Sequence, residues 1–397
     1  MMRGMSEAGG RSGGADFHAG AGGANRTMAA NRRMRRRNWL REAVGLILLA
    51  LLLAAVCLGR LMVGESLTGG LSVEVLRSMW EIRQDRLLAG LTVGAALSVG
   101  GVLLQAMLRN PLASPYLLGI SGGAAVGVQI SRAGLLAVVN AWLIDRGVPG
   151  MSETGAALIG AWGTLIVVYL LSQRRGWVDP LGLVLVGVVV TSIAAAAIMF
   201  IHVFRPSSDI FEWMMGYFNE SKFDDPAITL NLTAWGGFWA TLAEEPIELA
   251  LLHVVMVVVA MGVVFSFVLG RAMDVATLNE SEAASVGLNV GRLRLVMFML
   301  AGMMTSMTVV LAGPIGFVGL IGPHVARLLM GPRHRPLVIG AALIGAALVV
   351  GADTVVRLVS VHFEGVGLLP LGAVMSVVGG PLFVLLLRRQ LGRGGAP

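Results

Sequence analysis

The feature that most constrains the fold is a series of apolar runs, each about 20 residues long, that recurs along the whole chain. A helix of this length is long enough to cross the hydrocarbon core of a bilayer. Hydrophobic residues make up 56% of the 397 residues and charged residues only 13%, too few to cover the surface of a soluble protein of this size. The sequence therefore predicts an all-α polytopic membrane protein.

About ten transmembrane helices are expected, because the sequence contains ten apolar runs with charged, glycine-containing or proline-containing segments between them. The two runs in the middle of the second half are the easiest to confuse with a single helix, since the later of them is short and marked by glycine and proline. The expected spans lie near 43–63, 87–107, 117–139, 155–173, 181–204, 247–270, 294–312, 314–330, 337–356 and 369–387.

The distribution of arginine predicts the orientation of these spans. An arginine cluster at 32–37 directly precedes the first run, which is too long for a signal peptide and lacks its small-residue cleavage site. With both termini in the cytoplasm, the inner flanks carry about twice as many basic residues as the outer flanks, as the positive-inside rule requires. We expect a disordered basic tail over 1–40, a ten-helix domain over 41–390 and a cytoplasmic tail over 391–397.

Several kinds of chemistry are not expected from this chain. Lys222 is its only lysine and lies outside any phosphate-binding loop motif, so ATP hydrolysis by that route would need a separate polypeptide. The six histidines lack the spacing of metal ligands, so no metal site is predicted. The net charge of +7 is interpreted as cytoplasmic arginine beside anionic lipid, not as a nucleic-acid site.

The corner between the second and third spans contains Pro111 and Pro115, which cannot donate backbone hydrogen bonds and push the residues before them away from helix. The chain must therefore break here, on the side predicted to be cytoplasmic. The longest inner segment, about 272–293, contains one short amphipathic helix that should stop at Gly287. Either a docking surface for a partner or a solvated loop fits this segment. The extended outer segment, 205–246, contains tryptophans suited to the membrane interface.

Asp353 is the only carboxylate deep within a predicted span, and Arg357 follows one helical turn later. Aspartate four residues before arginine is the favourable order for a helical ion pair. We therefore predict a structural pair between them; the alternative is a proton relay.

Several long motifs resemble the FecCD-type permeases of bacterial ABC importers, which take up iron-siderophore complexes, heme and cobalamin. The resemblance extends over about 40–390. The motifs are Glu81-Ile-Arg-Gln-Asp-Arg86 and the run after it to Gln105, Arg109-Asn-Pro-Leu-Ala-Ser-Pro115, Leu118-Gly-Ile-Ser-Gly-Gly-Ala124, Gly287-Leu-Asn-Val-Gly-Arg292, Ala312-Gly-Pro-Ile-Gly-Phe-Val-Gly-Leu-Ile-Gly-Pro-His-Val-Ala-Arg327, Ala352-Asp-Thr-Val-Val-Arg357 and Leu369-Pro-Leu-Gly372.

This resemblance implies a type II, cobalamin-permease-like importer subunit in the bacterial cytoplasmic (inner) membrane. Such a subunit is expected to bind no cofactor itself and not to be an enzyme. The expected partners are a second permease copy or paralogue, two ATPases that use ATP and Mg²⁺, and a periplasmic or extracellular substrate-binding protein. The expected cargo is an iron chelate, either a siderophore or heme, with cobalamin as a further candidate. The alternative is a stand-alone secondary transporter or facilitator of a small organic solute.

The resemblance also assigns roles to individual residues. The arginines expected to dock the binding protein are Arg83, Arg86 and Arg357, although Gln84-Asp85 replaces the family's usual Leu-Pro between the first two. The expected inner gate comprises Asn110, Leu112, Asp179 and Pro180. The residues expected to couple the chain to the ATPases are Leu278, Asn279, Glu280, Glu282, Ala283, Gly287 and Leu288.

Overall fold

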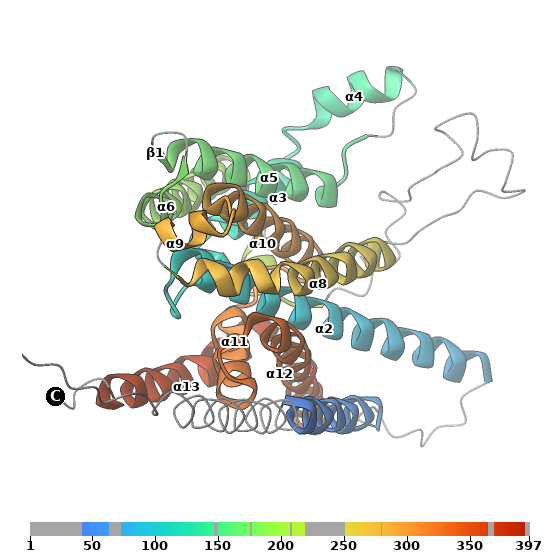
Figure 1. Ribbon diagram of the computed structural model, residues 1–397. Helices are drawn as coiled ribbons and strands as arrows, with labels where there is room; N and C mark the ends of the chain where they lie inside the picture. The colour runs from blue at the N-terminus through green and yellow to red at the C-terminus, as the bar shows by residue number, and fades with distance from the viewer. Residues whose placement is uncertain are drawn as a thin grey trace, which may run out of the picture.

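The computed structural model describes residues 42–62, 73–146, 150–174, 177–206, 209–218, 251–278, 280–363 and 369–393 (Figure 1). The predicted tail 1–40 and most of the predicted outer segment lie outside these residues. At the C-terminus, the last helix runs to Arg393, three residues into the segment predicted to be a tail.

The described chain is almost entirely helical. A two-residue antiparallel pair, β1 (Gln173–Arg174) with β2 (Trp177–Val178), closes the turn between two of the helices. The helices are the first, Glu42–Met62, then α2 (Val73–Leu108), the 3₁₀ turn η1 (Pro115–Leu118), α3 (Ile120–Arg132), α4 (Ala137–Asp145), α5 (Glu153–Leu171), α6 (Pro180–Phe204), α7 (Asp209–Met214), α8 (Leu251–Ala276), α9 (Glu280–Ser285), α10 (Val290–Ala312), α11 (Val318–Met330), α12 (His334–His362) and α13 (Leu371–Arg393).

Seven helices of the described chain are long and apolar enough to cross a membrane, and the bent pair of α3 and α4 would make an eighth. Two further apolar helices, α11 and Leu371–Leu385 of α13, are shorter. The polytopic all-α fold is therefore confirmed, whereas the count of ten spans stays a prediction. The two apolar runs that are easiest to confuse with a single helix form separate helices, because α10 ends at Ala312 and α11 begins at Val318.

One expected span is wrong in detail. The run near 117–139 was expected to be a single helix, but α3 and α4 meet at an angle of 76°. Gly134 lies between them at φ +70°, a left-handed conformation that costs glycine little and interrupts a right-handed helix. The apolar pattern continues across this residue, so hydropathy alone does not reveal the bend.

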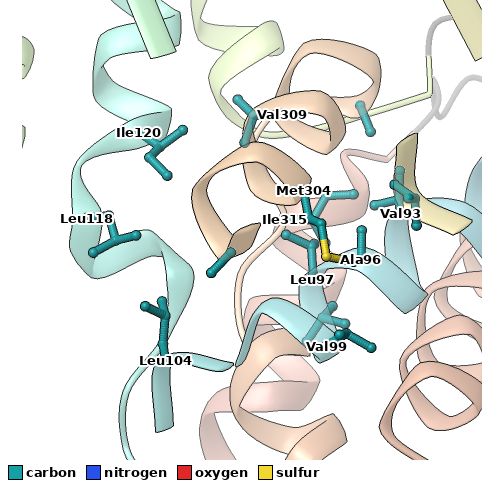
Figure 2. Close-up of a cluster of buried hydrophobic side chains, with 14 of the residues drawn as sticks. Val93, Ala96, Leu97, Val99, Leu104, Leu118, Ile120, Met304, Val309 and Ile315 are labelled. Carbon is teal, nitrogen blue, oxygen red and sulfur yellow. The ribbon is translucent and has the colours of Figure 1, made fainter. Parts of the chain in front are cut away.

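Helix α2 lies at the centre of the bundle, between α8 and α10 on one side and α11 and α12 on the other (Figure 1). Figure 2 shows the core that this arrangement encloses, where Leu97 of α2 and Met304 of α10 point toward one another beside Ile315. All three side chains are buried. The apolar contacts of the core therefore come from segments about 200 residues apart in the sequence.

Glycine allows the closest helix contacts. A Cβ atom on Gly94 of α2 would lie 2.2 Å from the carbonyl oxygen of Gly345 in α12, and the reciprocal distance is 2.1 Å. Gly123 of α3 and Gly160 of α5 meet in the same way, with 2.4 Å and 2.1 Å. Membrane helices associate largely through van der Waals packing, so small residues at the crossing point determine how closely the backbones approach.

The outermost helices expose apolar side chains broadly. On α6, Leu181, Phe200 and Val203 are each about two-thirds or more exposed, and the first helix exposes Leu48 and Leu51 similarly. A helix that is apolar on its exposed side is suited to hydrocarbon, not to water. These faces support the assignment of the chain to a membrane.

Candidate functional site

The residues predicted to face the cytoplasm gather at one end of the bundle, which we call the inner end. Arg333 Nη1 lies 3.3 Å from Glu42 Oε1, so the start of the first helix meets the start of α12. The corner after α2 and the loop after α8 also meet there. The predicted alternation of loops is therefore consistent with the packing, while the charge bias alone indicates which end is cytoplasmic.

Arg109 connects two of the inner segments. Its Nη2 donates to the carbonyl oxygens of Ala276 and Leu278, each at 2.7 Å, and thereby caps the C-terminal end of α8. A cation is favourable at that end because helix carbonyls there lack intrahelical partners and carry the negative end of the helix dipole. The backbone of Arg109 has φ +47°, which lets the chain turn as α2 ends.

The gate residues predicted at this corner form a tight turn. The Asn110 Oδ1 accepts a hydrogen bond of 2.9 Å from the backbone N–H of Leu112, and both residues are exposed. Such a side-chain turn is what Asn favours before proline, and it stiffens the corner. The geometry brings both residues next to Arg109; the gating role itself stays a prediction.

Asp179 and Pro180, the other predicted gate residues, begin α6. Asp179 caps the helix through a hydrogen bond of 2.9 Å from Gly182 N–H to Oδ2, and Pro180 occupies the first turn, where its missing N–H costs nothing. This capping accounts for both residue types without a gate. Their gating role stays a prediction.

Gln105 of α2 bonds to the corner and to α11. Its Nε2 approaches the carbonyl oxygens of Ala113 and Gly319 at 3.5 and 3.4 Å, and its Oε1 accepts from Arg327 Nη2 at 3.1 Å. This buried amide therefore connects α2, the corner and α11. A buried amide whose donor and acceptor are both used is a specific orienting group.

The coupling loop was predicted over about 272–293; in the structure the segment between α8 and α10 is 277–289, and it contains α9. Gly287 after α9 adopts φ +81°, so the predicted short helix and its stop are confirmed. Ala283 of this helix is fully buried, while Leu278 before the helix and Val286 after it are 46% and 69% exposed. Glu282 is exposed and Leu288 is partly buried. Asn279 and the side chain of Glu280 lie outside the described structure. The loop thus presents apolar side chains at the inner end; its coupling role stays a prediction.

The segment after α11 is fixed to the end of α8. Asp274 Oδ1 accepts from the backbone N–H of His334 at 2.9 Å and lies 2.7 Å from its Nδ1. An open cavity of about 470 Å³ lies between these inner segments. It is lined by Gln105, Ala106, Arg109, Asn110, Pro111, Thr277, Arg327, Pro332 and His334.

At the opposite, outer end, the predicted pair of Asp353 with Arg357 is wrong. The Asp353 carboxylate instead accepts from Arg60 Nε at 2.5 Å and from Arg86 Nε at 2.9 Å. All three side chains are buried, and a buried carboxylate is stabilised better by two guanidinium groups than by one partner at the edge of its own helix. The cluster joins the first helix, α2 and α12.

This cluster also changes the docking prediction. Arg86 is 5% exposed and bonded to Asp353, so its position explains helix packing and not surface recognition. Arg83 and Arg357 are partly exposed. For these two residues, docking stays a prediction.

Sequence reasoning missed the roles of Arg60 and Gln105. Arg60 lies near the outer end of the first predicted span, at the same predicted membrane depth as Asp353, and this match in depth and opposite charge was a usable signal. Gln105 gave no comparable signal, because its partners are two backbone carbonyls and Arg327, 222 residues away.

Known proteins resemble this chain in sequence and in fold. The sequence model of the FecCD transport family matches residues 43–253 and 245–389. The chain is 34% identical over 374 residues to the vitamin B12 import system permease protein BtuC of Klebsiella pneumoniae, covering 93% of this chain and 98% of that protein. It is 34% identical over 312 residues to the cobalamin import system permease protein BtuC of Halobacterium salinarum, covering 77% of this chain and 72% of that protein.

A solved structure described as an inward-facing metal-chelate type ABC transporter has the same fold. It matches with a TM-score of 0.66 and 25% sequence identity, over 87% of this chain and 99% of that chain. The family match covers most of the chain, and the relatives match across most of their own lengths. This multi-pass membrane protein therefore belongs to the FecCD transport family.

Proposed function

We propose that this chain is the permease subunit of an ATP-driven importer in the bacterial cytoplasmic membrane and that its cargo is a cobalamin-class corrinoid. The match to vitamin B12 import permeases, over 98% of the length of one of them, carries this proposal. Heme and siderophore complexes are the second candidate cargo, supported by the resemblance to a metal-chelate type transporter.

The inner end supports coupling to a separate ATPase. The loop 277–289 exposes Leu278 and Val286 on the surface of the inner end, while the buried Ala283 packs α9 against the bundle. A partner that moves α9 would also move the end of α8. Because Arg109 holds that end through Ala276 and Leu278, the movement would reach the corner at Asn110 and Leu112. This is a rigid-body route from a docking loop to the predicted gate.

The complete importer would contain two permease chains, two ATPases that use ATP and Mg²⁺, and a substrate-binding protein on the outer side. Arg83 and Arg357, which are partly exposed, would contact acidic groups of the binding protein. Arginine suits this contact because its planar guanidinium pairs with both oxygens of a carboxylate.

Proteoliposomes test both the partners and the cargo. The complex of permease, ATPase and cobalamin-loaded binding protein should accumulate cobalamin when ATP is supplied, and omission of the ATPase should abolish uptake. Cobalamin uptake by the permease alone would instead support a stand-alone transporter. Uptake of an iron chelate but not cobalamin, by the full complex, would overturn the cargo and leave the importer assignment intact.

A further inference from the structure

The cavity at the inner end is formed by segments that are distant in the sequence. Gln105 and Ala106 come from α2, Arg327 comes from α11, and the corner, Thr277, Pro332 and His334 complete the lining. Its volume of about 470 Å³ lies within the usual range for small-ligand sites, about 300–1,000 Å³. The cavity is therefore large enough for more than one ordered water molecule.

The charge in this cavity is not balanced by the lining groups. Arg109 donates to the carbonyls of Ala276 and Leu278, and Arg327 donates to the amide oxygen of Gln105, so both guanidinium groups bond to neutral oxygens. Within the described ranges, no lining residue is acidic. Asp274, which is not a lining residue, is engaged with His334: its Oδ1 accepts from the His334 backbone N–H and lies 2.7 Å from the ring Nδ1.

The guanidinium groups supply the donors for an anion. Each guanidinium carries five N–H donors, and the hydrogen bonds above use few of them. Of the other polar lining groups, the Gln105 amide and the Thr277 hydroxyl already donate to backbone carbonyl oxygens. Basic pockets between membrane helices at the cytoplasmic side are suited to phosphate head groups, and paired arginines match several oxygens of one phosphate.

We propose that this cavity binds a phosphate-bearing anion through Arg109 and Arg327. The phosphate oxygens belong either to the head group of an anionic lipid or to free inorganic phosphate, which offer the same chemistry. A phosphate fits better than one protein carboxylate, because its oxygens point in tetrahedral directions and can serve two arginines from separate segments, whereas the two oxygens of a carboxylate lie in one plane. The bound anion would hold the end of α2 against α11 at the place where Arg109 already contacts α8.

The test uses the purified full-length chain without ATPase, binding protein or cargo, so its result does not depend on the transport assignment. In one arm, native mass spectrometry measures phosphatidylglycerol retained from mixed phosphatidylglycerol and phosphatidylcholine nanodiscs. In the other, inorganic phosphate is titrated against the thermal midpoint of the chain in neutral detergent, with chloride at equal ionic strength as the reference.

The variants are Arg327→Gln and Arg109→Gln, and the matched control is Arg292→Gln, an exposed inner arginine that does not line the cavity. Arg109→Gln keeps the test decisive if loss of the Gln105 contact prevents Arg327→Gln from folding. We expect saturable binding of one equivalent of phosphatidylglycerol or of phosphate to the wild type. Binding should weaken at least tenfold in both cavity variants and remain unchanged in the control.

Retention of phosphatidylglycerol alone identifies the lipid head group, and a response to inorganic phosphate alone identifies the free anion. The proposal is overturned if neither probe binds saturably, or if the folded cavity variants bind as the wild type does.

Discussion

Arg60 Nε lies 2.5 Å from Asp353 Oδ2, although 293 positions separate these residues in the sequence. Both side chains are 3% exposed, so the contact is an internal connection between the first helix and α12. Arg86 of α2 binds the other oxygen of the same carboxylate. Three helices are thus held at the outer end by one acidic group.

Asp353→Asn should therefore destabilise the protein strongly. Removing one partner from a buried ion pair costs about 3 to 5 kcal/mol, because a buried charge loses its counter-charge. Two arginines lose theirs here. Thermal unfolding in detergent would measure the loss, with Arg357→Gln as the control that changes a residue outside the cluster. A larger loss in Arg357→Gln than in Asp353→Asn would restore the pairing expected from the sequence.

Gly94→Ala should separate α2 from α12. The new Cβ would meet the Gly345 carbonyl oxygen at 2.2 Å, so the helices must move apart, and overpacking of this kind costs about 1 to 3 kcal/mol. Gly163→Ala is the matched control, because a Cβ on Gly163 of α5 has no neighbour within 4 Å. Thermal midpoints and the monodisperse yield in detergent should fall only for Gly94→Ala. Equal behaviour of the two variants would contradict the close crossing.

Arg109→Ala should reduce ATP-dependent uptake by about tenfold or more in the reconstituted importer. Hydrogen bonds from a charged donor contribute about 1.5 to 3 kcal/mol, and about 1.4 kcal/mol corresponds to tenfold. The two contacts to the end of α8 are lost, so movement of α9 no longer reaches the corner. Arg333→Gln, which removes an inner ion pair with Glu42, is the control. Wild-type uptake by Arg109→Ala would refute this route.

The two outer arginines of the same motif should respond differently to charge reversal. Arg83→Glu changes a partly exposed residue and should weaken association with the binding protein about tenfold while leaving the thermal midpoint unchanged. Arg86→Glu places a second acid beside Asp353 and should instead prevent stable folding. Surface plasmon resonance and thermal unfolding separate these effects. Normal folding of Arg86→Glu with weakened docking would return this residue to the binding surface.

The class of fold and the position of most helices could be predicted from the sequence. Apolar runs of bilayer length leave few alternatives, and Pro111, Pro180 and Gly287 interrupt or begin helices through local backbone chemistry alone. The short helix of the loop 277–289 was also predictable, because its residues and its stop signal are adjacent in the chain. The resemblance to FecCD-type permeases could also be recognised from the long sequence motifs.

Which charged groups meet could not be predicted from the sequence, because it depends on how the helices pack. Asp353 has an arginine one turn away on its own helix, but it pairs with Arg60 and Arg86 from other helices. These two partners are favoured because together they bond to both oxygens of the buried carboxylate. The same holds for Arg109 with α8 and for Gln105 with Arg327. Local sequence specifies helices through neighbouring residues, whereas these contacts depend on how distant helices cross, and glycine crossings such as Gly94 with Gly345 set that geometry.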